Sequence, residues 1–201
     1  MRKIILLLLL LASLPSTRAG ELVIRVTDDG GGAIGEAVVW AVARQGAAAK
    51  PPRPAVMDQR NRKFIPHVLV VQTGATVSFP NSDNVRHQVY SFSPPKSFQL
   101  PLYTGTPANP ILFDKPGIVS LGCNIHDEMS AFIVVVDTSH FGTTSGDGLV
   151  VIPGMSSGDY SVHVWHPDMR TATPARSITL AGARTELSLT ITRSRRGDAR
   201  P

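Results

Sequence analysis

The chain alternates short β-rich runs with turn residues along nearly its whole length, and this pattern constrains the fold most. The runs 21–27, 87–92 and 131–136 are examples, and Gly, Pro, Asn, Asp and Ser separate them from their neighbours. Beyond the N-terminal segment no window shows helical periodicity. Many short strands with turn signals between them are typical of β-sandwiches and barrels, so we expect an all-β fold.

The first 19 residues have the features of a secretory signal peptide. Arg2 and Lys3 give a basic start, the leucines from Leu6 to Leu11 give a short apolar core, and small residues precede Gly20. This apolar core is shorter than the roughly 20 residues of a spanning helix, which makes an uncleaved anchor the lesser alternative. We therefore expect a periplasmic or secreted protein with no membrane span after signal removal.

The positive charge of the chain lies at its two ends. The formal net charge is +5 at pH 7, and three of the cations, Arg2, Lys3 and Arg18, belong to the expected signal peptide. The segment 193–201 carries four arginines and one aspartate, so the residues between the two ends have a net charge near −1. We expect the tail to be disordered and basic, and we expect no nucleic-acid partner because no basic face is apparent.

Cys123 is the only cysteine, which excludes an intramolecular disulfide bond. A lone thiol in an oxidising compartment is a liability unless it is buried or bound to a metal. Cys123, His126 and Met129 follow one another at three-residue steps, between two predicted strands. Thiolate, imidazole and thioether ligands together suit copper in both of its oxidation states. The simpler alternative is a buried free cysteine beside a surface histidine.

A second histidine lies well upstream of this loop. His87 precedes Cys123 by 36 residues and begins a predicted strand, and Asn81 lies six residues before His87. With these residues and the Cys-x-x-His-x-x-Met loop, the segment 57–137 resembles the cupredoxins, the blue copper family of plastocyanin, pseudoazurin and amicyanin. By overall pattern it is similar to the exported cupredoxins labelled methylamine utilisation proteins.

The resemblance implies a Greek-key β-sandwich that holds one type 1 copper ion. Carried over to this sequence, His87, Cys123 and His126 are the equatorial ligands and Met129 is the axial ligand. Asn81 corresponds to the asparagine that forms hydrogen bonds near the cysteine and ties the two ligand segments together.

The two ends of the chain resemble a second family, the transthyretin-like modules of the carboxypeptidase regulatory type. The resemblance rests on the N-terminal strand-turn-strand and on the segments 148–154 and 158–162. A single sandwich with extra edge strands is the alternative. The expected organisation is a signal peptide at 1–19, a cupredoxin domain at 55–137, a transthyretin-like β-sandwich from 20–46 plus 138–192, and the basic tail at 193–201.

The site favours one-electron transfer between exported redox proteins, such as a dehydrogenase or a c-type cytochrome, and we do not expect an enzyme. Asp127 and Glu128 stand beside His126, where small blue copper proteins usually have apolar residues, and they suggest a partner with a positive rim. Two other functions remain open. One is a periplasmic copper carrier or chaperone, which would use the same ligands. The other is a non-redox binding module, which would have lost the metal. For His67 we expect a structural role, or a role in supporting the metal ligands, and not ligation itself.

Overall fold

The computed structural model describes residues 20–45 and 50–194. The expected signal peptide, residues 1–19, lies outside them, as do residues 195–201 of the expected tail. All regular secondary structure within the described ranges is β-strand, which confirms the all-β prediction. No helix in these ranges is long and apolar enough to span a bilayer.

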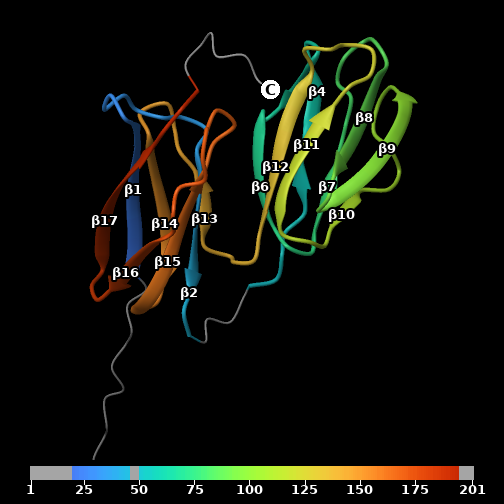
Figure 1. The fold of residues 1–201 in the computed structure, drawn as a ribbon. Coiled ribbons are helices and arrows are strands. Elements are labelled where there is room, and N and C mark those ends of the chain that lie inside the picture. The colour runs from blue at the N-terminus through green and yellow to red at the C-terminus, as the bar shows by residue number, and fades with distance from the viewer. Residues whose placement is uncertain (1–19, 46–49, 195–201) are drawn as a thin grey trace, which may run out of the picture.

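One β-sandwich, here called the terminal sandwich, draws its strands from both ends of the described chain (Figure 1). Its strands are β1 (Gly20–Asp28), β2 (Val38–Ala43), β13 (Phe141–Thr143), β14 (Leu149–Met155), β15 (Gly158–Trp165), β16 (Arg176–Leu180) and β17 (Arg184–Ile191). They form one sheet in the order β14-β1-β17 and another in the order β13-β2-β15-β16. Because β1 pairs in parallel with β17, the first and last strands lie side by side.

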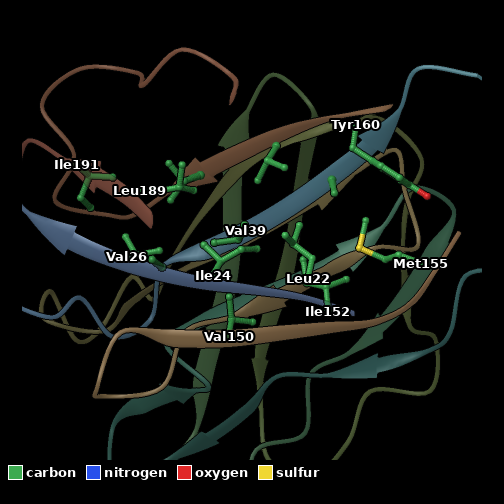
Figure 2. Packing of buried hydrophobic residues seen from close by; sticks show 14 of the residues in the cluster. Leu22, Ile24, Val26, Val39, Val150, Ile152, Met155, Tyr160, Leu189 and Ile191 are labelled. Carbon is green, nitrogen blue, oxygen red and sulfur yellow. The ribbon is translucent and has the colours of Figure 1, made fainter. Parts of the chain in front are cut away.

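Alternating apolar residues explain how β1 enters the core of the terminal sandwich. Leu22, Ile24 and Val26 are fully buried and point between the two sheets (Figure 2). They pack in one cluster with Ile152 of β14 and Val39 of β2. Complete burial of an aliphatic side chain contributes about 1.5–3 kcal/mol, so this alternation stabilises the pairing register of the strand.

The second sandwich, here called the central sandwich, lies between the two halves of the first along the chain. Its strands are β3 (Ala55–Val56), β6 (Val68–Gln72), β7 (Ala75–Ser78), β8 (His87–Ser93), β9 (Lys96–Tyr103), β10 (Ile111–Phe113), β11 (Gly117–Gly122) and β12 (Ser130–Val136). They form sheets in the orders β10-β7-β3 and β6-β12-β11-β8-β9. A separate hairpin consists of β4 (Asp58–Arg60) and β5 (Lys63–Ile65).

The apolar run of β12 is buried on both faces, as its sequence predicts. Ile133 and Val135 belong to the core of the central sandwich. Val134 and Val136 face the other way and pack in a cluster with Val38 of β2. This cluster joins the two sandwiches, and the aromatic rings of Phe132 and Trp165 meet within it edge to face, 5.3 Å apart.

The ordered fold extends past the expected start of the tail at residue 193. The Arg193 guanidinium is paired with the Asp168 carboxylate at 3.0 Å, and the backbone N–H of Ser194 donates to the carbonyl of Asp168 at 2.8 Å. Arg193 also forms an isolated β-bridge with Met169. The expected boundary of the tail is therefore corrected, since specific contacts hold the first two of its residues.

Candidate metal centre

Three of the four residues expected to bind a metal come together at one end of the central sandwich. The ligand atoms of His87, Cys123 and His126 all lie within 4.8 Å of one another. Within residues 20–45 and 50–194, this is the one group of three or more His, Cys, Asp or Glu side chains close enough to hold a metal ion. His87 begins β8, Cys123 directly follows β11, and His126 lies in the loop that leads to β12.

Strand pairing explains why residues so distant in sequence meet. β11 and β12 are antiparallel neighbours, and the pair Gly122 and Ser130 closes the loop that contains Cys123, His126 and Met129. The N–H of Met129 donates to the carbonyl of His126 at 2.9 Å and tightens this loop. Because β8 pairs with the other side of β11, its first residue, His87, lies next to the loop.

The candidate ligands differ in their exposure to solvent. The exposed fraction is 0% for His87, 4% for Cys123 and 1% for Met129, whereas His126 is only partly buried. Cys123 and Met129 belong to the same apolar cluster of the central sandwich. His126 is flanked by the exposed residues Ile125 and Asp127. The site therefore lies just beneath the surface, with His126 nearest to solvent.

The two imidazole rings and the thiol lie close to one another. The sulfur of Cys123 lies 3.9 Å from Nδ1 of His126. The rings of His87 and His126 have centroids 5.0 Å apart and meet at an angle of 63°. Two imidazoles and one sulfur thus surround a single point.

His87 has one satisfied nitrogen and one that lacks a hydrogen-bond partner. Its Nε2 lies 2.7 Å from Oδ2 of Asp83. Its Nδ1 is buried and has no partner among the described residues. An unsatisfied buried polar atom costs about 1–3 kcal/mol, and a metal ion bound to Nδ1 would remove this cost. The donor set at this position therefore fits a metal ion.

Asp83 is a functional candidate that the sequence analysis missed. Its carboxylate accepts hydrogen bonds from the backbone N–H groups of Asn61 at 2.6 Å and Arg62 at 2.9 Å, besides its bond with His87. Burial alone would raise the pKa of Asp83, but the hydrogen bonds from Arg62, His87 and Asn61 outweigh it and lower the pKa below the ordinary value. The one feature of the sequence that could have pointed to Asp83 is its position four residues before His87.

Asn81 makes different contacts from those expected. Its side-chain amide donates to the carbonyls of Val85 at 2.9 Å and Tyr103 at 2.8 Å, and its Oδ1 accepts from the N–H of Asp83 at 3.0 Å. These bonds organise the segment that leads into His87 and join it to the end of β9. Among the described residues, the side-chain hydrogen bonds of Asn81 do not reach the cysteine loop, because its amide N–H groups donate to Val85 and to Tyr103 of β9.

Tyr103 lies beneath this segment and stays protonated. Burial raises the pKa of Tyr103 to about 12, although the hydrogen bond from Gln59 acts in the opposite direction. The hydroxyl donates to the carbonyl of Phe79 at 2.6 Å and accepts from the side-chain amide of Gln59. Tyr103 also pairs with His87 across β8 and β9, so it helps to fix the backbone of the first candidate ligand.

His67 lies outside this group. Its Nδ1 is 3.3 Å from a carboxylate oxygen of Glu36, a residue that precedes β2 in the terminal sandwich. Its ring and that of Phe132 meet edge to face, with centroids 5.7 Å apart. His67 therefore makes contacts between the two sandwiches.

No family model and no curated protein matches the sequence. Solved structures that resemble the chain include a copper-containing nitrite reductase from Thermus scotoductus, with 30% identity over 46% of this chain and a TM-score of 0.40. A purple cupredoxin from Nitrosopumilus maritimus has 21% identity, with 40% of this chain and 96% of that chain covered and a TM-score of 0.35. A reduced amicyanin variant has 21% identity, with coverages of 48% and 99% and a TM-score of 0.37.

This chain spans only 24% of the nitrite reductase. The structures just described overlap with less than half of this chain. The function is therefore inferred from the geometry of the site itself.

Proposed function

We propose that the protein binds one type 1 copper ion through His87, Cys123, His126 and Met129 and carries single electrons between redox proteins. The observation that carries this proposal is the unpartnered, buried Nδ1 of His87 beside the sulfur of Cys123 and the ring of His126. Met129 completes the set because it is buried in the same cluster as Cys123 and lies at the end of the same loop.

The donor types support copper over other metals. Two imidazoles and a thiolate with a weak thioether form the ligand set of blue copper sites, whereas zinc has no need of the thioether. A copper ion in this set would accept and release one electron. Thiolate ligation would also keep the lone thiol of Cys123 deprotonated and protected from other chemistry.

The protein's own contribution is a buried site with one accessible side. His87 and Cys123 are held by β8 and β11, and both side chains are buried. Of the four proposed ligands only His126 is partly exposed, so electrons would pass to and from a docked partner through its ring. Asp127 and Glu128 beside it are exposed and would attract a partner with a positive rim.

The proposed partners are exported redox proteins, either a dehydrogenase or a c-type cytochrome. Export to the periplasm or beyond is supported by the signal-like N-terminal sequence. Membership of the methylamine utilisation group, and a transthyretin-like identity for the terminal sandwich, remain parts of the same proposal.

The proposal is tested by adding Cu(II) to the mature chain and recording the visible spectrum. We expect one copper per chain and an intense band from thiolate-to-copper charge transfer. The variant Cys123→Ala should lack this band, because no other cysteine is present. A control variant, Asp114→Ala, changes an exposed carboxylate and should keep the band. A wild-type protein that stays colourless with excess copper would contradict the proposal.

The rate of copper loss separates an electron carrier from a copper chaperone. A buried four-residue set should release copper slowly to a weak chelator. Loss within seconds would favour a carrier that hands its metal to other proteins.

A further inference from the structure

We propose that Asp83, held by the tip of the β4–β5 hairpin, is a positioning residue that fixes His87 as a metal ligand through Nδ1. This inference rests on the proposed copper site. It assigns a role to a hairpin that belongs to neither sheet of the central sandwich.

The tip of the hairpin forms a small anion-binding concavity. Asn61 and Arg62 join β4 to β5, and both have positive φ angles, 54° and 56°. Residues other than glycine adopt this conformation rarely, and it is maintained where the surroundings demand it. Two successive left-handed residues direct their N–H groups to the same side, and here those groups donate to the two carboxylate oxygens of Asp83.

Other contacts anchor the hairpin to the segment that carries Asp83. The hydroxyl of Ser82 donates to the carboxylate of Asp58 at 2.9 Å, and the N–H of Ser82 donates to the carbonyl of Gln59 at 2.9 Å. The N–H of Gln59 in turn donates to the carbonyl of Pro80 at 3.0 Å. Asp83 is thus held in two ways. Its carboxylate is bound by the turn at Asn61 and Arg62, and the backbone segment that precedes it is hydrogen-bonded to the hairpin.

Asp83 determines which nitrogen of His87 carries the hydrogen. An ionised carboxylate only accepts hydrogen bonds, so Nε2 of His87, 2.7 Å away, must donate. In the neutral ring Nδ1 then has a free lone pair, and Nδ1 is the buried atom without a partner. The ring is fully buried at the start of β8, so its orientation is fixed as well. The geometry therefore prepares His87 for metal binding before any metal arrives.

The first test reads the tautomer of His87 directly in the copper-free protein by nitrogen-15 NMR of the ring. We expect one tautomer, with a slowly exchanging hydrogen on Nε2 and an unprotonated Nδ1. A wild-type spectrum with the hydrogen on Nδ1 would overturn the inference. This result does not depend on copper, so it is distinguishable from a failure of the proposed function.

The second test replaces the carboxylate. Asp83→Ala removes the acceptor, and we expect loss of the single-tautomer signature together with about 10–100-fold weaker copper binding. Asp83→Asn keeps one acceptor oxygen, but its NH2 group is a donor and would face either the N–H of Asn61 or the donors Arg62 and His87. Its effect should therefore be intermediate. If the Asp83→Ala variant does not fold, the tautomer and the copper affinity are measured on Asp83→Asn instead.

The matched control is Asp114→Ala, which removes an exposed carboxylate paired with Lys96 and should change neither readout. If both Asp83 variants fold and retain the wild-type tautomer and copper affinity, the positioning role is excluded while the copper site stands.

Discussion

The side chains of the site differ in how firmly the protein holds them. His87 is buried and bonded to Asp83, and Cys123 is buried directly after a strand. His126 is half-buried in a loop whose other residues include exposed acids. We infer that His87 and Cys123 fix the geometry of the site, while His126 connects it to the surface.

The loop ligands could be predicted from sequence, whereas Asp83 could not. Cys123, His126 and Met129 lie within seven residues, so one loop brings them together whatever the rest of the fold. His87 was identified through the family resemblance. The role of Asp83 depends on the N–H groups of Asn61 and Arg62, which belong to a turn that no sequence pattern reveals.

Met129→Leu provides a test at the residue scale. The two side chains have similar volumes, so we expect a loss of stability below about 1.5 kcal/mol. The charge-transfer band should persist because His87, Cys123 and His126 are unchanged, while the reduction potential should shift because the axial ligand tunes it. Spectroscopy and voltammetry measure both properties. An unchanged potential would exclude Met129 as the axial ligand.

At the scale of elements, strands with apolar alternation were predicted well and polar or proline-containing strands were missed. The run 87–92 corresponds to β8, which extends one residue further, and β12 is buried on both faces as its apolar run predicts. The β4–β5 hairpin is short and polar, and its turn lacks glycine, so its sequence carries no recognisable hairpin signal. β9 contains Pro101, which argues against a strand, but β9 is the edge of its sheet, where proline is tolerated.

At the scale of the whole molecule, two sandwiches share one apolar interface. The cluster around Val134 and Val38 joins the outer face of β12 to the sheet of β2, and the contact between His67 and Glu36 lies beside it. The sequence indicated two groups of strands, but not which faces meet, because that depends on how Trp165 and Phe132 fit together.

The pH dependence of stability tests the packing of the terminal sandwich. Burial lowers the pKa values of His140, His163 and His166 below the ordinary value of 6.5. Near pH 6.5 and below, these histidines therefore bind more protons in the unfolded chain than in the folded chain. The free energy of unfolding should be insensitive to these groups above about pH 6.5 and should fall as the pH decreases below it.

Denaturant unfolding of the protein without added copper, at about pH 7.5 and about pH 5.5, measures this effect. His163→Phe should retain the ring that stacks on Trp40 and reduce the dependence on pH. Equal stability of the wild-type protein at the two pH values would contradict the burial of these imidazoles.

The central claim is that one metal ion lies among four side chains from two distant segments, and a crystal structure of the copper-loaded protein tests it most directly. Anomalous scattering at the copper edge should give one peak per chain, in contact with Nδ1 of His87, the sulfurs of Cys123 and Met129, and the ring of His126. A copper peak elsewhere, or one that His87 does not contact, would contradict the account.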